Sequence, residues 1–132
     1  MKTYGLSKKE RLKNKPLIKA LFESGEHLTI SPIKFLWLRT EFQEPYPAQV
    51  IFAVPTKTFR KAFERNKIKR LLREAYRLHK PEIYKIFNSD ESQYALGLIF
   101  ISRKKVTFEV ICKSLELFIN HLKENKAFST RE

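Results

Sequence analysis

The sequence has few of the residues from which disulfide frameworks and metal clusters are built. Its only cysteine, Cys112, excludes an intrachain disulfide and a cysteine-based zinc cluster. Its three glycines are scattered, so they do not form a glycine-rich phosphate loop. No apolar run approaches the roughly 18 residues of a transmembrane helix, and no apolar segment follows the N-terminus as in a signal peptide. We therefore expect a cytoplasmic protein.

Residues for protein-based catalysis are scarce as well. A protein nuclease needs metal-binding carboxylates or a pair of histidines for acid–base chemistry. The three histidines, His27, His79 and His121, have no motif around them, and Asp90 is the only aspartate. We expect no catalytic residue and no tight metal site in this chain, so that any chemistry belongs to a partner.

Acidic side chains are also few compared with basic ones. Twenty-seven Lys and Arg against 14 Asp and Glu give a formal net charge of +13. Residues 1–25 hold seven basic and two acidic side chains, and residues 57–80 hold ten and two. A charge that serves solubility would be spread evenly, whereas a surface for phosphates is concentrated. The distribution favours nucleic acid as the partner over an anionic membrane surface.

The hydrophobic pattern predicts an α+β fold. A short amphipathic helix is expected after Asn14, with Pro16 at its first position and a left-handed Gly25 as its cap. Four apolar runs rich in aromatic or β-branched residues predict strands, of which the first lies at the sheet edge and the last is central. These runs lie at residues 28–30, 35–38, 50–54 and 94–101.

Two further helices complete the pattern. One is expected over residues 60–79, ending before Pro81, and the other after the capping residue Thr107. The order of helix, strands, basic helix, strand and helix predicts a two-layer α+β sandwich, with a right-handed crossover to the last strand by default. We expect one RNA-binding domain over residues 1–126 and a frayed tail over residues 127–132.

The predicted helix at residues 60–79 has two chemically different faces. With successive residues 100° apart, apolar residues fill an arc of about 120° and leave an opposite basic arc of about 100°. The basic arc contains no acid and consists of Asn66, Lys69, Arg70, Arg73 and Arg77. Its cations repeat about every 6 Å, close to the spacing of phosphates along a strand. A solvated face with ion pairs would alternate in sign, so the arc favours a surface for nucleic acid.

The same stretch resembles the signature of the bacterial ribonuclease P protein component, which reads Arg-Asn-Arg, two residues, Lys-Arg, two residues and Arg. The matching residues are Arg65, Asn66, Lys69, Arg70 and Arg73. Lys67 stands where the family prefers arginine, which keeps the charge but weakens a bidentate contact. Residues 6–12 and 54–62 are also similar to that family, and the resemblance covers roughly residues 6–124.

The resemblance implies the accessory protein subunit of ribonuclease P, a ribonucleoprotein endoribonuclease. Such a subunit binds a catalytic RNA and the 5′ leader of precursor tRNA, so that the leader is removed and the mature 5′ end is formed. The RNA subunit is implied to carry out catalysis and, with the substrate, to hold most of the Mg²⁺. The resemblance also implies a left-handed βαβ crossover through the basic helix, in contrast to the default. We expect no membrane partner, because the apolar face of the basic helix is needed for the core, and we expect no obligate protein partner.

Two groups of residues are the candidate sites. The basic helix and the loop before it are expected to bind RNA through Lys57, Arg60, Lys61, Arg65, Asn66, Lys67, Lys69, Arg70, Arg73 and Arg77. The resemblance implies a cleft between the first helix and the sheet that holds the leader. This agrees with the chemistry of single-stranded RNA, which binds to aromatic platforms beside cations. The candidates for this cleft are Ile18, Phe22, Phe35 and Trp37. Core packing is the alternative for the last two, because one sequence does not show which face of a strand a residue occupies.

A non-enzymatic RNA-binding protein, such as a ribosomal protein or an RNA chaperone, is the alternative function. Composition does not separate the two, since ribosomal proteins share a high positive charge. A helix that reads the major groove of DNA is less favoured, because such helices mix Gln, Asn and Ser with their phosphate-binding cations.

Overall fold

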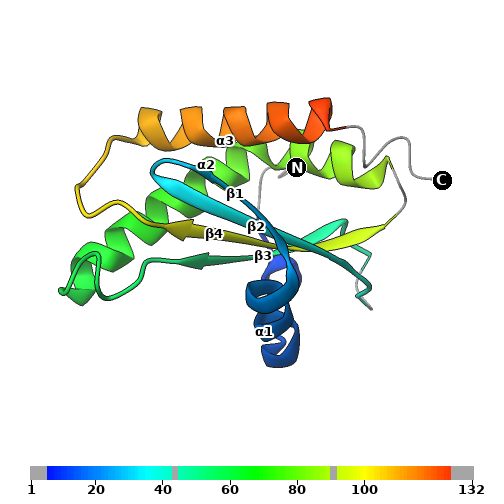
Figure 1. Ribbon diagram of the computed structural model, residues 1–132, viewed down its shortest axis with the longest axis horizontal. Coiled ribbons are helices and arrows are strands. Elements are labelled where there is room, and N and C mark those ends of the chain that lie inside the picture. The colour runs from blue at the N-terminus through cyan, green and yellow to red at the C-terminus, as the bar shows by residue number, and fades with distance from the viewer. Residues whose placement is uncertain (1–5, 43–44, 90–91, 126–132) are drawn as a thin grey trace.

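One four-stranded sheet organises the molecule, with helices on both of its faces (Figure 1). The computed structural model describes residues 6–42, 45–89 and 92–125. In chain order its elements are a short 3₁₀ turn η1 (Lys8–Glu10), α1 (Lys15–Ser24), β1 (Glu26–Ile30), β2 (Ile33–Thr40), β3 (Ala48–Ala53), α2 (Ala62–Asn88), β4 (Gln93–Phe100) and α3 (Phe108–Glu124). Within these ranges, no helix is both long enough and apolar enough to cross a membrane. The predicted α+β order is confirmed.

The sheet combines antiparallel and parallel pairing. Its strand order is β1–β2–β4–β3, in which β2 is antiparallel to β1 and β4, while β3 and β4 run parallel. The basic helix α2 connects the parallel pair. β4 is buried along its whole length except at Gln93, which confirms the prediction of a central strand covered on both faces.

The two faces of the sheet bury different side chains. α2 and α3 lie over one face, and α1 packs against the other (Figure 1). The largest fully buried side chains of the core under α2 and α3 are Phe35, Tyr76, Phe87, Phe100 and Phe118. The smaller core beneath α1 consists of Leu12, Leu21, Leu36, Ala95 and Ile99. Side chains of β2 alternate between these two cores, and this alternation decides which of them face α1.

The first helix lies where the sequence predicts it, but its C-terminal end differs. The Asn14 side chain accepts a hydrogen bond from the Leu17 N–H at 3.0 Å, and Pro16 is the second helical residue rather than the first. The prediction of a left-handed Gly25 is wrong: its φ of −69° and ψ of 157° are extended, because β1 starts at the next residue. A glycine is needed there for space, since a Cβ atom would lie 2.5 Å from the Leu21 carbonyl oxygen.

The predicted end of α2 at Pro81 is also wrong. The helix continues to Asn88, and Pro81 lies exposed inside it. A proline within a helix costs about 3 kcal/mol, because it removes a hydrogen bond and crowds the preceding turn. Ile83 and Phe87 follow it and are fully buried in the larger core, at a gain of about 1.5–3 kcal/mol each. Their burial offsets the cost of the proline.

A buried ion pair joins the N-terminal segment to α2. Glu10 and Lys80 are both buried, and Lys80 Nζ lies 2.8 Å from Glu10 Oε2. The Tyr84 hydroxyl donates to the same oxygen at 2.6 Å, and the Ser7 N–H donates to Glu10 Oε1 at 2.8 Å. Burial by itself would raise the pKa of Glu10, but these hydrogen bonds and the charge of Lys80 outweigh burial and lower it. The carboxylate therefore stays ionised and holds η1 against α2.

Glu10→Gln should lower the free energy of unfolding by about 3 kcal/mol, because it leaves the buried Lys80 ammonium facing a neutral amide. Since the pKa of Glu10 is lowered in the folded protein, the carboxylate contributes fully above its ordinary pKa of 4.5. That contribution is lost as the pH falls through the lowered value, so Glu10→Gln should flatten the acid limb of the stability profile. Urea unfolding at several pH values measures both effects.

Glu82→Gln is the matched control for this variant. Glu82 is exposed and forms a 3.3 Å ion pair with Lys123 at the surface. An exposed pair contributes about 0–1 kcal/mol, so this change should be nearly neutral. Equal losses in the two variants, or an unchanged acid limb in Glu10→Gln, would contradict the stabilising role of the buried pair.

Candidate nucleic-acid interface

α2 turns its apolar face inward and its basic face outward, as its sequence predicts. The apolar face is buried in the larger core through Ile68, Leu72, Ala75 and Tyr76. The basic face reaches the surface at Asn66, Lys67, Lys69, Arg70 and Arg73. Because the core holds one side of the helix, the backbone that carries these cations is rigid.

Arg73 is more tightly constrained than an exposed arginine. Its guanidinium carbon lies 5.9 Å from the centre of the Phe52 ring, and its Nε atom is buried without a hydrogen-bond partner among the described residues. Burial lowers the pKa of Arg73, and the nearby charges of Arg11 and Arg70 lower it further. Three guanidinium groups thus share one region, and a phosphate bound there would relieve their repulsion.

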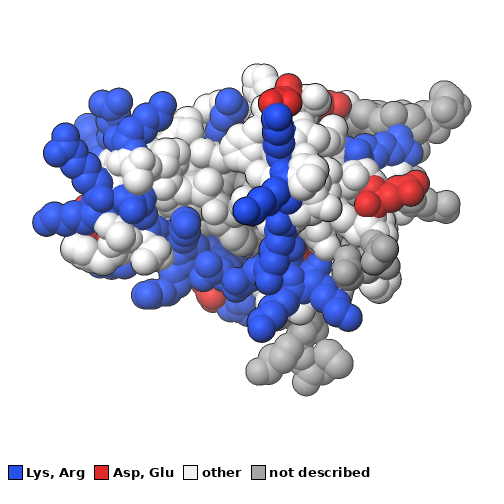
Figure 2. All heavy atoms as spheres, turned by 90° about the horizontal axis from the view of Figure 1, so that it is seen from below, with Lys and Arg blue, Asp and Glu red and all other residues white. Residues whose placement is uncertain are grey.

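Arg11 belongs to this region but is absent from the predicted RNA-binding residues. It follows Glu10, whose ion pair with Lys80 fixes the N-terminal segment beside α2, and it forms a parallel β-bridge with Val50 of β3. Exposed lysines of the same segment extend the basic surface: Lys8, Lys9, Lys13, Lys15 and Lys19. Viewed from the side of α1, Lys and Arg cover much of the molecule and few acids interrupt them (Figure 2). The basic excess of residues 1–25 is the signal that points to this surface.

Two of the predicted arginines have partners within the protein. Arg65 is half-buried, and its Nη1 atom donates to the carbonyl oxygens of Phe59 at 2.8 Å and Arg60 at 2.6 Å. Arg65 therefore holds the loop before α2 in place. Arg77 forms an ion pair with Glu74, whose pKa is lowered by the hydrogen bonds from Arg77. The basic arc itself contains no acid, but Glu74 beside it pairs with Arg77 and leaves that cation less available to RNA.

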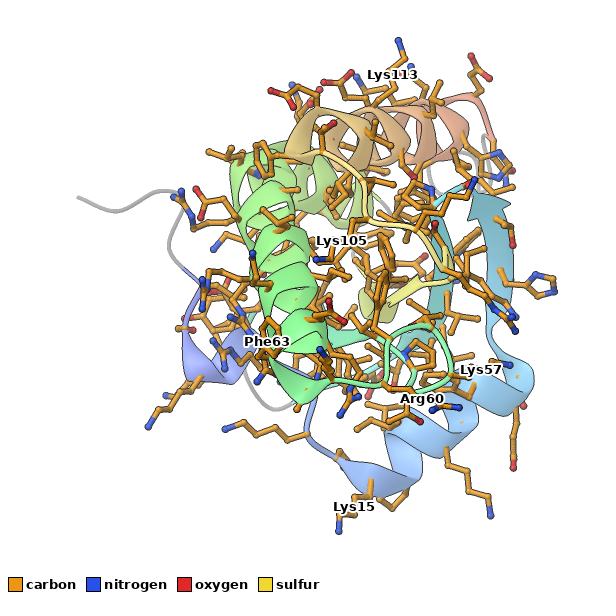
Figure 3. The ribbon with its side chains drawn as sticks, turned by 90° about the vertical axis from the view of Figure 1, so that its left-hand side faces the viewer. Lys15, Lys57, Arg60, Phe63, Lys105 and Lys113 are labelled. Carbon is orange, nitrogen blue, oxygen red and sulfur yellow. The ribbon has the colours of Figure 1, made fainter. Side chains whose placement is uncertain are left out.

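Two loops on the side of the molecule where α2 starts carry further cations (Figure 3). The loop before the helix exposes the predicted residues Lys57, Arg60 and Lys61. The loop after β4 exposes three more, which the sequence prediction missed: Arg103, Lys104 and Lys105. Lys105 Nζ lies 3.3 Å from the Glu64 carboxylate, which holds the loop after β4 against the first turn of α2. Three consecutive cations after a buried strand are the signal that could have found them.

Phe35 and Trp37 do not line a surface with Phe22, so this part of the predicted leader cleft is wrong. Their side chains are 0% and 3% exposed and lie in the core under α2 and α3. Phe35 stacks on Phe118 of α3 with 4.2 Å between ring centres, and the Trp37 ring lies 5.4 Å from the same residue. α1 lies on the opposite face of the sheet (Figure 1).

The residues of β2 that face α1 are those that alternate with Phe35 and Trp37 along the strand. Leu36 is buried beneath α1, and Leu38 is partly buried in the same cluster. Ile18 is half-buried against this cluster, whereas Phe22 of the same helix is 49% exposed. Lys34 occupies the same face of β2 by strand alternation. Ile18 and Leu38 thus lie in the same cluster, while Phe22 is exposed on α1, so Leu38 and Lys34 replace Phe35 and Trp37 as the strand residues on the α1 side.

The described ranges contain no group of three or more His, Cys, Asp or Glu side chains that could hold a metal ion. His79 Nδ1 lies 2.8 Å from the Ala75 carbonyl oxygen one turn earlier in α2. His121 contacts the edge of the Trp37 ring, with 6.2 Å between ring centres. Both histidines thus serve the packing of their helices. Asp90 and the predicted tail lie outside the described residues.

Comparisons with known proteins agree with the basic helix. A family model described as Ribonuclease P matches residues 6–123. The ribonuclease P protein component of Porphyromonas gingivalis is 30% identical over 115 residues, which cover 86% of this chain and 83% of the relative. These matches do not favour the alternative of a ribosomal protein or an RNA chaperone.

Two solved structures share the fold. The RNase P protein of Thermotoga maritima has a TM-score of 0.64 at 21% identity, covering 85% of this chain and 96% of that chain. A Staphylococcus aureus RNase P protein mutant with defective mRNA degradation activity has a TM-score of 0.67 at 23% identity, covering 88% and 90%. The family match over residues 6–123 shows that the chain belongs to the bacterial ribonuclease P protein components, the accessory subunits of a ribonucleoprotein endoribonuclease that processes tRNA.

Proposed function

We propose that α2 binds the catalytic RNA of ribonuclease P through its basic face, and that the surface between α1 and the sheet binds the 5′ leader of precursor tRNA. The observation that carries the proposal is the group of Arg11, Arg70 and Arg73 beside one rigid helix face. Loop residues Lys57, Arg60 and Lys61 extend the RNA contact beyond the end of the helix.

A folded RNA supplies the negative charge that this face needs. Phosphates repeat along a strand at about the spacing of the cations along α2. The guanidinium groups of Arg70 and Arg73 present forks that suit two phosphate oxygens, and the exposed Asn66 can donate to a phosphate or a 2′-hydroxyl. Each phosphate contact releases condensed counterions, so the affinity should depend steeply on salt.

The surface beneath α1 suits a single strand without a fixed sequence. Ile18, Phe22 and Leu38 offer partly exposed apolar surface to the bases. Lys15, Lys19 and Lys34 supply cations from the same helix and the same strand face. Aromatic platforms beside cations bind single strands with little dependence on sequence, because every base has a stacking face. This set takes the place of the buried aromatic pair of β2.

Mg²⁺ belongs to the RNA and the substrate in this proposal. Mg²⁺ prefers carboxylate and phosphate oxygens in octahedral geometry. The described part of the chain brings no three acidic, imidazole or thiol side chains together, so its donors do not fit a tight metal site. The side chains of this subunit bind and orient RNA through its phosphates and bases.

The proposed function predicts that cleavage of precursor tRNA at low Mg²⁺ requires both this chain and its cognate RNA subunit. Bound cations of the protein offset repulsion between phosphates that Mg²⁺ would otherwise have to screen. The measurement is the rate of 5′-leader release with each component omitted in turn. A rate that is the same with and without the chain would contradict the proposal.

Arg70→Ala should weaken binding of the RNA subunit and lower the slope of log affinity against log salt by about one, and adding Lys67→Ala should lower it by about two. Both side chains are exposed, so neither change should disturb folding. Binding titrations at four or more salt concentrations measure the slope.

Lys113→Ala is the matched control, since Lys113 is an exposed cation on α3, far from the loop that carries Lys57 and Arg60 (Figure 3). It removes the same charge from another surface, so the slope should stay close to that of the unchanged protein. If the slope of log affinity against log salt were the same for Arg70→Ala and Lys113→Ala, the basic face of α2 would not be part of the interface.

Phe22→Ala should weaken binding of leader-bearing precursor tRNA by roughly 1–3 kcal/mol, the contribution of one base stacked on an aromatic ring. Binding of mature tRNA to the same holoenzyme should not change, because it has no leader. Val110→Ala is the control, since Val110 is an exposed apolar residue on α3, across the sheet from α1. A loss of equal size with and without the leader would place Phe22 outside the leader site.

A further inference from the structure

Phe63 in the first turn of α2 is an exposed aromatic residue that the sequence prediction did not single out. Its side chain is 61% exposed, although the larger core lies on the other side of the same helix. Full burial of a phenylalanine side chain stabilises the folded protein, and a ring that stays exposed does not make this contribution. An aromatic ring in this position is available to a partner.

The surroundings of Phe63 are cationic. Lys67 and Arg70 follow it by four and seven residues, which places all three on one side of α2. The ammonium group of Lys61 lies 6.0 Å from the centre of the Phe63 ring. Figure 3 shows Phe63 at the start of α2, near the loop that carries Lys57 and Arg60. The ring therefore lies at one end of the row of phosphate-binding cations.

We infer that Phe63 is a stacking platform for an unpaired nucleobase of the RNA that lies along the basic face of α2. The inference rests on the proposed function, and it names the part of the RNA that meets this end of the helix. A base within a duplex is already stacked on both sides, so only an unpaired base can lie on the ring. Cations beside an aromatic platform are the arrangement by which proteins hold the backbone and the bases of a single strand together.

Charge complementarity favours RNA over a protein as the occupant. A protein partner would need an apolar pocket surrounded by acids to match Phe63 and its cationic neighbours. The acids of α2 nearest to Phe63 in sequence do not neutralise the cations around it, since Glu64 pairs with Lys105 and Glu74 with Arg77. RNA supplies both the phosphates for the cations and the base for the ring.

The test compares Phe63→Ala, Phe63→Leu and Phe63→Trp in binding to the RNA subunit of ribonuclease P from the same organism. Phe63→Ala should weaken binding roughly 5- to 150-fold, the equilibrium equivalent of one base–aromatic stack. The salt slope should stay unchanged, because no cation is removed. Phe63→Leu keeps apolar area but lacks the aromatic face, so it should resemble Phe63→Ala, whereas Phe63→Trp should bind at least as well as the unchanged protein.

Leu78→Ala is the matched control, because Leu78 is another exposed apolar residue of α2, at 42% exposure. It should leave the affinity unchanged. Binding to a fully paired RNA duplex should also be the same for Phe63→Ala and the unchanged protein, since no unpaired base is present. Full affinity of Phe63→Ala for the RNA subunit, or an equal loss with the duplex, would overturn the inference.

Fluorescence gives an independent readout. The only tryptophan of the chain, Trp37, is 3% exposed and provides a constant background. The indole introduced by Phe63→Trp should be quenched when the RNA subunit binds, because a base then stacks on it. Bound RNA without quenching would overturn the inference, as would a change of oligomeric state in Phe63→Ala with unchanged RNA affinity. If the unchanged protein does not bind the RNA subunit at all, the proposed function itself fails.

Discussion

The two-faced character of α2 is the constraint on which the rest of the structure depends. The helix cannot turn its cations inward, because unpaired guanidinium groups in the core would cost far more than the fold can supply. Its apolar face must therefore cover the sheet, as Leu72 and Ala75 do, and its basic face must lie outside. Fold and RNA binding thus use opposite sides of one element. The exposed cations repel one another, and this repulsion destabilises the folded protein until bound RNA neutralises it.

A second interaction, the buried Glu10–Lys80 pair, joins two segments that are distant in sequence into one surface. Residues 1–25 and 57–80 carry the basic excess of the sequence, yet nothing in their order says that they meet. The buried Glu10–Lys80 pair brings them together and places Arg11 beside Arg73. A buried pair is a weak source of net stability but a strong constraint on register, because either charge alone would be costly. Its value here is that it positions the N-terminal cations against α2.

The sequence predicts the elements whose patterns are strong and fails where tertiary context decides. Period and charge along α2 were sufficient to orient it, and the apolar run of β4 to make it central. In β2, residues 35–38 are all apolar because both faces of that strand are covered, so alternation did not tell which pair faces α1. Proline usually ends a helix, but α2 continues past Pro81 because Phe87 is buried in the core. Glycine after a helix is usually left-handed, but Gly25 is extended because β1 starts at the next residue. The cations at residues 103–105 do not stand out in the charge distribution, because residues 81–132 hold eight basic and seven acidic side chains that nearly balance.

The cations of this surface differ in how far they are organised before RNA arrives. Lysines on α1 are exposed on long flexible stems, so they lose rotamer freedom on binding and act mainly by attracting RNA from a distance. Arg73 is held over the Phe52 ring with its Nε atom buried, and Arg65 fixes the loop next to it through two carbonyl oxygens. Side chains held in this way lose little entropy when they meet a phosphate, and their forks demand one orientation. Affinity and orientation should therefore reside in a few arginines of α2, and the many surrounding lysines should govern the rate at which RNA is captured.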